Sequence, residues 1–230
     1  MKFENTQVFN ICGAMRGMRN PLESWNNMDS GLVDDYEGRI WRSEVSYEEI
    51  GEKDLKLAQN LLKASIKEGN SHSKFMRQIL VSVDIAAPLY WWKEFDQYKV
   101  GTVTNSTSTM HKIQASPITL NCFEINDYND SLNMIDDVPI CVRVDNFIND
   151  LEQLRQLYLQ TKDKKYWKEL IRWVPESWLQ TRTVTMNYQV IRQMYFDRRN
   201  HKLTEWREAF IDWVKILPYA EELIMYEGDD

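Results

Sequence analysis

Residues Ile171 to Arg207 read IRWVPESWLQTRTVTMNYQVIRQMYFDRRNHKLTEWR, and this stretch decides how the second half of the chain folds. Its arginines, interleaved with Trp, Tyr and Phe, are Arg172, Arg182, Arg192, Arg198, Arg199 and Arg207. The whole chain carries 28 basic and 35 acidic side chains, so this run of arginines lies in an acidic protein. Arginine stays charged at any working pH and binds phosphate through paired hydrogen bonds. The stretch therefore predicts either a helix with solvated charges or an anion site built from more than one element.

The composition indicates one aromatic-rich domain over residues 1–230. Apolar residues make up 43% of the chain, which is enough for a hydrophobic core. The nine Trp, eleven Tyr and eight Phe indicate an aromatic interior or a stacking surface for a flat ligand. The net charge of −7 argues against non-specific nucleic-acid binding, because such binding needs a positive field. The same net charge is compatible with a small phosphorylated ligand in a local basic pocket.

The cysteines and histidines are too scattered for a disulfide framework or a metal site. They are Cys12, Cys122 and Cys141, and His72, His111 and His201. The odd number of cysteines suits a reducing cytoplasm, and the histidines lack the spacing of paired metal ligands, so we predict no metal. The N-terminus lacks the apolar core of a signal peptide, and no apolar run reaches the ~20 residues that span a bilayer. We expect a cytoplasmic protein with no membrane partner.

The first half of the chain predicts strands and one clear helix. Residues 5–12 predict a short strand, and the Gly-, Pro- and Asn-containing residues 13–31 predict a loop. Ser46–Glu49 resembles a capping box before apolar residues at helical spacing, which end at Gly69. The β-branched residues 75–85 predict a buried strand.

Two further segments leave alternatives open. Pro88 opens either a helix or a second strand over residues 87–98. Residues 100–112 include six Ser or Thr and predict either a featureless loop or the lining of a polar ligand site. Residues 118–147 mix apolar, Asp and Asn residues and suggest an insertion.

The last third predicts mainly helices. Apolar spacing indicates helices from Phe147 to about Thr161 and over residues 166–174, with Ser177 capping a further helix over residues 178–199. A final amphipathic helix ends at Pro218, and the acidic tail from Glu221 is expected to fray. The predicted fold class is α+β: a small, mainly antiparallel sheet flanked by helices, with a mainly helical C-terminal half.

With these elements in order, the chain resembles the flavin-dependent thymidylate synthases, the ThyX family, roughly over residues 70–218. In that family an Arg precedes a Pro turn, an Asn follows, and a second Arg comes shortly before a long helix. Here these residues are Arg172, Asn187 and Arg198. The resemblance implies that the two arginines bind the nucleotide dUMP and that the asparagine binds flavin. Arg199, one position further on, is a possible substitute for Arg198.

The family's central signature, which begins Arg-His-Arg, is altered in this chain. It reads Gln97-Tyr98-Lys99, and its last Arg is replaced by Met110, whereas the Asn and Ser of the signature keep their mutual spacing. By resemblance, the expected flavin contacts are His72, Gln97, Tyr98, Lys99, Asn105, Asn187 and Gln193, and the expected nucleotide contacts are Glu94, Ser108, Arg172 and Arg198. Candidates to replace the missing arginine are His111, Lys112 and Arg182.

The resemblance implies reductive methylation of dUMP to dTMP. The one-carbon unit would come from methylenetetrahydrofolate and the electrons from NADPH through FAD, in a homotetramer with shared active sites. Arg198 is the expected catalytic residue, because an arginine beside the pyrimidine carbonyl would stabilise negative charge growing on the ring. No enzymic cysteine nucleophile is expected. Two alternatives stay open: a nucleotide- or flavin-binding protein of the same fold without turnover, and a structural domain with surface arginines.

Overall fold

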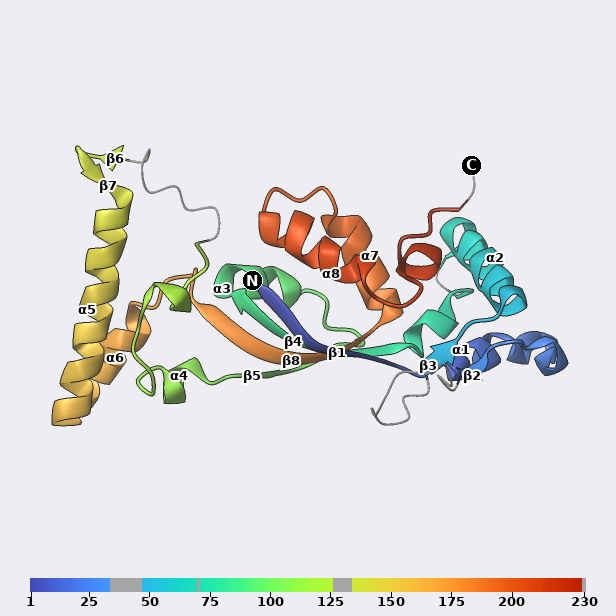
Figure 1. Ribbon diagram of the computed structural model, residues 1–230, viewed down its shortest axis with the longest axis horizontal. Helices are drawn as coiled ribbons and strands as arrows, with labels where there is room; N and C mark the ends of the chain where they lie inside the picture. The colour runs from blue at the N-terminus through green and yellow to red at the C-terminus, as the bar shows by residue number, and fades with distance from the viewer. Residues whose placement is uncertain (34–46, 70, 126–133, 229–230) are drawn as a thin grey trace, which may run out of the picture. The chain divides into compact units, whose positions relative to one another are not determined.

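The computed structural model describes residues 1–33, 47–69, 71–125 and 134–228 (Figure 1). The chain forms an α+β fold around a four-stranded, antiparallel sheet. In sheet order, the strands are β1 (Lys2–Phe9), β4 (Leu80–Pro88), β8 (Leu179–Asn187) and β5 (Val103–Ser106). The predicted fold class is confirmed, including a C-terminal half that is mainly helical.

Two compact units divide the chain. Unit 1 comprises Met1–Lys2, Ile85–Gln97 and Asn105–Thr183, and unit 2 comprises Phe3–Asp84, Tyr98–Thr104 and Val184–Asp230. Each unit is therefore assembled from segments far apart in the sequence. The single domain over residues 1–230 stays a prediction.

Unit 2 holds most of the aromatic core. Its α-helices are α1 (Ile11–Met18), α2 (Glu52–Glu68), α7 (Tyr188–Arg198) and α8 (Ile211–Lys215); π-helical turns span Glu205–Phe210 and Ala220–Ile224; and β2 (Gly31–Val33) pairs with β3 (Tyr47–Glu49). Trp206 and Phe210 are fully buried, and the ring of Phe3 stacks on Trp213 with centroids 4.8 Å apart. Tyr188 is also buried and donates its hydroxyl proton to the Pro218 carbonyl at 2.7 Å. Burial of this phenol raises the pKa of Tyr188. These rings account for the final amphipathic helix predicted before Pro218.

Residues 178–199 do not form one helix, so that prediction is wrong. Leu179–Asn187 is strand β8, in which Val184 and Met186 are buried and Thr181, Thr183 and Thr185 are exposed. This alternation with period two, in β-branched residues, favours a strand. The helix begins only at Tyr188, and Asn187 rather than Ser177 caps it by accepting a hydrogen bond from the Val190 amide at 3.0 Å.

The predicted loop over residues 13–31 is wrong in its first part, because Ile11–Met18 forms helix α1. Ile11, Ala14, Met15 and Met18 are buried at helical spacing. Gly13 and Gly17 are sites of close approach: a Cβ on Gly17 would lie 2.4 Å from the Gln78 Oε1 atom. Later residues form 3-10 turns at Asn20–Leu22 and Trp25–Asn27.

Helix α2 is confirmed, and it ends at Gly69 with φ of 95°. The capping box is wrong, because Tyr47–Glu49 is strand β3, and Ser46 lies outside the described residues. The cap comes from a distant residue instead. The Asp29 carboxylate accepts hydrogen bonds from the amides of Lys53 at 2.9 Å and Asp54 at 3.0 Å.

Two other expectations in unit 2 are corrected. Residues 75–85 are a strand only in part, because Lys74–Arg77 is a 3-10 helix and β4 begins at Leu80. The tail does not fray at Glu221: Leu223 and Ile224 are fully buried in the π-helical turn. Their apolar side chains keep the acidic segment packed.

Unit 1 is built around a helical hairpin. Its elements are α3 (Leu89–Phe95), α4 (Thr109–Lys112), a 3-10 turn at Leu120–Cys122, β6 (Met134–Ile135), β7 (Val138–Pro139), α5 (Ile140–Thr161) and α6 (Lys164–Arg172). The helix that was predicted from Phe147 begins earlier, at Ile140, and the break near Thr161 is confirmed. Its core contains Ile113, Ile118, Phe123, Ile148, Leu151 and Leu170. Buried Arg155 donates to both Glu152 carboxylate oxygens at 2.7 Å, and it lowers the pKa of Glu152 to about 2.

The structure gives the secondary structure of two segments that the sequence left open, and a ligand-lining role for residues 100–112 stays a prediction. Pro88 is followed by helix α3, not by a second strand. Residues 100–112 include strand β5 and helix α4, so a featureless loop is wrong for most of the segment. The suggested insertion lies partly outside the described residues, and its end forms β6, β7 and the start of α5. No helix in the described ranges is long and apolar enough to cross a membrane.

Candidate functional site

The predicted site residues are distributed over both units. Unit 2 contains His72, Tyr98, Lys99, Asn187, Gln193 and Arg198, and unit 1 contains Glu94, Gln97, Asn105, Ser108 and Arg172.

In unit 2, the segment Tyr98–Thr104 contacts helix α7 at both ends of the helix. Tyr98 contacts Asp197 and Arg198 near the C-terminal end of the helix. Gly101 lies at the opposite end, where a Cβ on it would be 2.6 Å from the Asn187 Nδ2 atom. The structure thus brings Tyr98 and Arg198 together, although they are 100 residues apart in the sequence.

Gly101→Ala is expected to lower the free energy of unfolding by about 1–3 kcal/mol, because φ at this position is 79° and the new methyl group would collide with Asn187. Chemical denaturation of the two proteins measures the difference. Gly31→Ala is the matched control, since a Cβ there meets nothing within 4 Å. An equal decrease of the free energy of unfolding in both variants would show that the backbone conformation of Gly101 does not cause the destabilisation.

Arg198 is held by hydrogen bonding and by aromatic rings. Its Nε atom donates to the Tyr98 hydroxyl at 3.0 Å, and that hydroxyl donates to Asp197 Oδ2 at 3.1 Å. The guanidinium carbon lies 5.0 Å from the ring centroid of Trp206 and 5.6 Å from that of Tyr98. Burial raises the pKa of Tyr98, and the nearby Arg198 opposes this effect only in part. The phenol therefore remains a neutral hydrogen-bonding group at neutral pH.

The other predicted residues of this set differ in exposure. Asn187 is buried and caps helix α7, whereas Lys99 and Gln193 are exposed. The Thr102 hydroxyl is buried and makes no hydrogen bond to any residue in the described ranges. A buried hydroxyl without a hydrogen-bond partner lowers the stability of the fold, so a polar atom of a ligand could serve as its partner.

In unit 1, Arg182 lies in a hydrogen-bonded network beside Ser108. Its guanidinium is 4.2 Å above the ring centroid of Trp92 and donates to Asp96 Oδ1 at 2.7 Å. Arg182 also donates to Gln180 Oε1 at 3.0 Å, and Gln180 in turn donates to the Thr107 carbonyl at 3.1 Å. Ser108 follows directly and caps helix α4 by accepting from the His111 amide at 3.2 Å.

Two crystal structures of the flavin-dependent thymidylate synthase ThyX from Helicobacter pylori, with FAD and dUMP, match with TM-scores of 0.65 and 0.64. They are 15% and 16% identical in sequence, and each match covers 99% of this chain and 98% of the other. This chain has the ThyX fold. No protein-family model and no curated protein matches the sequence.

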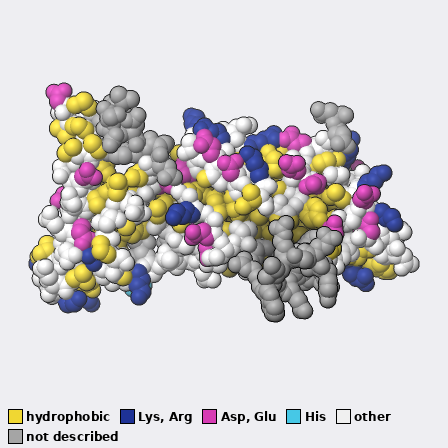
Figure 2. Space-filling view, in the orientation of Figure 1, with side chains coloured by type: hydrophobic (Ala, Val, Ile, Leu, Met, Phe, Trp, Pro, Cys, Tyr) yellow, Lys and Arg dark blue, Asp and Glu magenta, His cyan; other side chains and the backbone are white. Residues whose placement is uncertain are grey.

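Within this ThyX-like fold, the run of arginines serves several purposes. Arg192 is buried and donates to the carbonyls of Leu223 at 3.1 Å and Ile224 at 2.8 Å, so it holds the C-terminal turn. Arg199 pairs with Glu227. On the face shown in Figure 2, basic and acidic side chains are interspersed among the described residues. The sequence pattern alone did not separate these structural arginines from Arg198.

The remaining predicted residues of unit 1 are more exposed. Arg172 ends helix α6 and pairs with Glu169, and its side chain is 53% exposed. Gln97 and Asn105 are exposed, and Glu94 is half-buried. Their roles toward ligands stay predictions, since the contacts within the chain neither require nor exclude them.

His72 lines a pocket of about 480 Å³ in unit 2. The pocket lies among α1, α2 and the 3-10 helix Lys74–Arg77, with Met18, Leu57 and Phe75 among its lining residues. His72 Nε2 is 3.0 Å from Glu68 Oε2, so the imidazole has a partner within the chain. The predicted flavin role of His72 stays untested.

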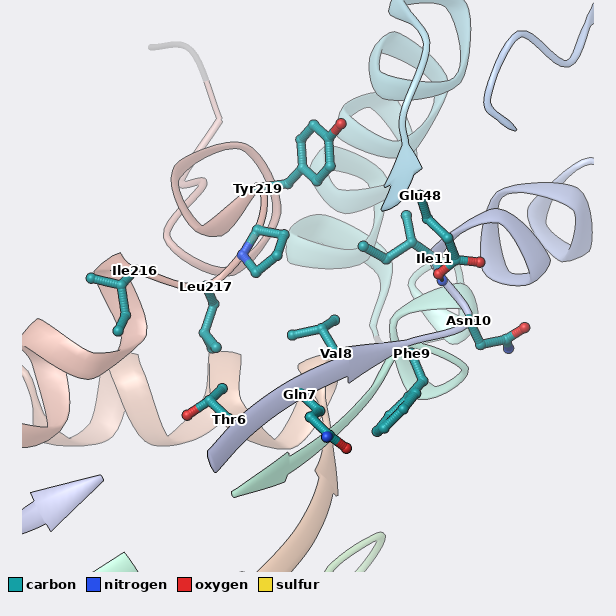
Figure 3. A pocket seen from close by; sticks show the side chains of 11 residues that line it. Thr6, Gln7, Val8, Phe9, Asn10, Ile11, Glu48, Ile216, Leu217 and Tyr219 are labelled. Atoms are coloured by element: carbon teal, nitrogen blue, oxygen red, sulfur yellow. Dashed lines mark hydrogen bonds between the residues drawn. The ribbon is translucent and has the colours of Figure 1, made fainter. Parts of the chain in front are cut away.

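A pocket of about 990 Å³ lies between the end of β1 and the segment 216–219 (Figure 3). Its polar groups already support the fold: Glu48 accepts from the amides of Ile11 at 2.6 Å and Cys12 at 3.3 Å, and the Tyr219 hydroxyl accepts from the Ile50 amide at 2.8 Å. None of the predicted site residues lines this pocket. No group of three or more His, Cys, Asp or Glu side chains in the described ranges is arranged to hold a metal ion.

Proposed function

We propose that this protein is a flavin-dependent thymidylate synthase that binds FAD and dUMP. The observation that carries the proposal is the likeness, over 99% of the chain, to ThyX structures with FAD and dUMP. It agrees with the resemblance of Arg172, Asn187 and Arg198 to the family's pattern. The proposal includes methylenetetrahydrofolate and NADPH as co-substrates and a homotetrameric assembly, which rest on the resemblance alone.

The resemblance proposes that the flavin is held by His72, Gln97, Tyr98, Lys99, Asn105, Asn187 and Gln193. Two of these side chains also have partners within the chain: Asn187 caps helix α7, and the Tyr98 hydroxyl is hydrogen-bonded to Arg198 and Asp197. The exposed ammonium of Lys99 suits an anionic cofactor, and the buried hydroxyl of Thr102 offers a hydrogen bond that the described chain does not use. A bound flavin, once reduced by NADPH, would pass those electrons to the methylation.

The residues proposed for the nucleotide are Glu94, Ser108, Arg172 and Arg198. Arg198 is the proposed catalytic residue. Its guanidinium is restrained by Tyr98 and Trp206, and a restrained cation stabilises developing charge on a pyrimidine ring without reorganising. An arginine also suits the phosphate of dUMP, which Arg172 is proposed to bind.

The free cysteines support a mechanism without an enzymic nucleophile. Burial, together with the charges of Glu48 and Asp54, raises the pKa of Cys12. This thiol is therefore mainly protonated at neutral pH, which disfavours attack on a substrate. Cys122 and Cys141 are half-buried and free.

Absorbance spectroscopy tests the proposal directly. The purified protein is titrated with FAD, then with dUMP, and is finally assayed for dTMP with methylenetetrahydrofolate and NADPH. We expect a bound-flavin band that shifts on addition of dUMP, followed by formation of dTMP. Absence of flavin binding at micromolar protein, with dUMP present, would contradict it.

A second candidate is a nucleotide-binding protein of the same fold without turnover. The altered signature Gln97-Tyr98-Lys99 favours this candidate. Its Tyr98 hydroxyl is hydrogen-bonded to Arg198 and Asp197 instead of being open to flavin. This candidate predicts that dUMP binds in the same titration while FAD does not.

Arg172→Ala is expected to weaken dUMP binding about tenfold to a hundredfold, because one charge-assisted contact to the phosphate is lost. Isothermal titration with dUMP and with uncharged deoxyuridine provides the measurement. Deoxyuridine affinity should be the same in both proteins. Lys164→Ala, a change at the other end of the same helix, is the control. Unchanged dUMP affinity in Arg172→Ala would remove this residue from the nucleotide site.

A further inference from the structure

The resemblance predicts that Tyr98 contacts flavin, yet its hydroxyl makes hydrogen bonds to two residues of the chain. A phenol has one proton to donate, and here the proton goes to Asp197 Oδ2 at 3.1 Å. The oxygen lone pairs then accept from Arg198 Nε at 3.0 Å. Donor and acceptor directions are thus both fixed by helix α7, which carries Asp197 and Arg198 as neighbours.

The contact restrains the guanidinium in two ways. A hydrogen bond through Nε restricts the orientation of the whole group, because Nε is part of the rigid guanidinium. The rings of Trp206 and Tyr98, at 5.0 Å and 5.6 Å from the guanidinium carbon, restrict its position further. An arginine that is held in this way loses less rotational freedom when it binds a ligand.

We propose that Tyr98 is a positioning residue for Arg198: it holds the guanidinium in the orientation that binds the nucleotide, and it acts on the nucleotide rather than on flavin. The inference rests on the proposed function, because it takes Arg198 as a ligand of dUMP. It gives a role to the residue that stands where the family's signature has His.

Tyr98→Phe removes the hydroxyl and keeps the ring. Titration of dUMP into FAD-saturated protein should show an affinity about threefold to tenfold lower than in the wild type. Titration of FAD into nucleotide-free protein should show unchanged affinity. Tyr226→Phe removes a hydroxyl elsewhere in unit 2 and should leave both affinities unchanged.

A double-mutant cycle separates positioning from a general effect on folding. Tyr98→Phe should have no further effect on dUMP affinity in an Arg198→Ala background, since the tyrosine acts through the arginine. Additive losses would overturn the inference. So would a loss of FAD affinity with unchanged dUMP affinity, which would identify Tyr98 as a flavin contact.

The cycle also separates failure of the inference from failure of the proposed function. If Arg198→Ala weakens dUMP binding and Tyr98→Phe does not, only the positioning role is lost. If Arg198→Ala leaves dUMP binding at the wild-type value, the nucleotide role of Arg198 fails, and the inference fails with it.

Discussion

Replacing Arg198 with alanine is expected to lower the rate of dTMP formation about a hundredfold to a thousandfold, with the fold intact. Removal of one preorganised donor from a developing charge typically has an effect of this size. The family resemblance assigns this role to Arg198, and the surroundings of the residue suit it. It is half-buried and held by Tyr98 and Trp206, whereas Arg192 is used to bind the carbonyls of the C-terminal turn.

The measurement is single-turnover formation of dTMP at saturating dUMP, with circular dichroism to verify the fold. Arg207→Ala is the matched control, because Arg207 is exposed and pairs with Glu208 at 2.7 Å. Arg198→Lys keeps the charge but not the planar group, and it should recover only part of the rate. A turnover in Arg198→Ala equal to that of Arg207→Ala would exclude Arg198 as the catalytic residue.

The elements that the sequence predicted well are those with a strong local period. Helix α2 and the final helix both bury apolar residues at helical spacing, such as Ala58 and Leu62 in α2. Gly69 caps the end of α2, and the final helix ends at Lys215, shortly before Pro218. Residues 179–187 form strand β8 instead of the predicted helix because their buried and exposed side chains alternate from Thr181 to Met186. This period of two belongs to a strand, and the cap signal at Ser177 does not outweigh it.

Other features depend on contacts between distant segments, which no local pattern contains. The cap of α2 comes from Asp29, and the glycines of α1 accommodate side chains such as Gln78. The candidate site is of this kind. The resemblance predicts its residues. The hydrogen bond between Tyr98 and Arg198 is not predicted, because it joins positions 100 residues apart.

Asp54→Ala is expected to reduce the free energy of unfolding by about 3–5 kcal/mol at neutral pH, because it leaves the buried guanidinium of Arg19 without its partner. Asp54 is fully buried, and its Oδ1 accepts from Arg19 Nε at 2.5 Å. Its Oδ2 accepts from the Ser30 hydroxyl at 2.6 Å and from the amides of Asp29 at 3.1 Å and Ser30 at 2.9 Å. Asp212→Ala, which removes an exposed carboxylate paired with Lys215, should change the stability by less than ~1 kcal/mol.

The same carboxylate predicts how stability depends on pH. Burial works to raise the pKa of Asp54, but the hydrogen bonds from Ser30, Arg19 and the backbone outweigh it and lower the pKa. A lowered folded pKa means that Asp54 contributes its full stability above the unfolded value of about 3.9 and loses it as pH falls through the folded value. The stability difference between wild type and Asp54→Asn should therefore be largest at neutral pH and shrink below about pH 4. Urea denaturation at a series of pH values measures it, and a difference that stays constant down to the acid limit would mean that the carboxylate charge is not what stabilises the Arg19 cluster.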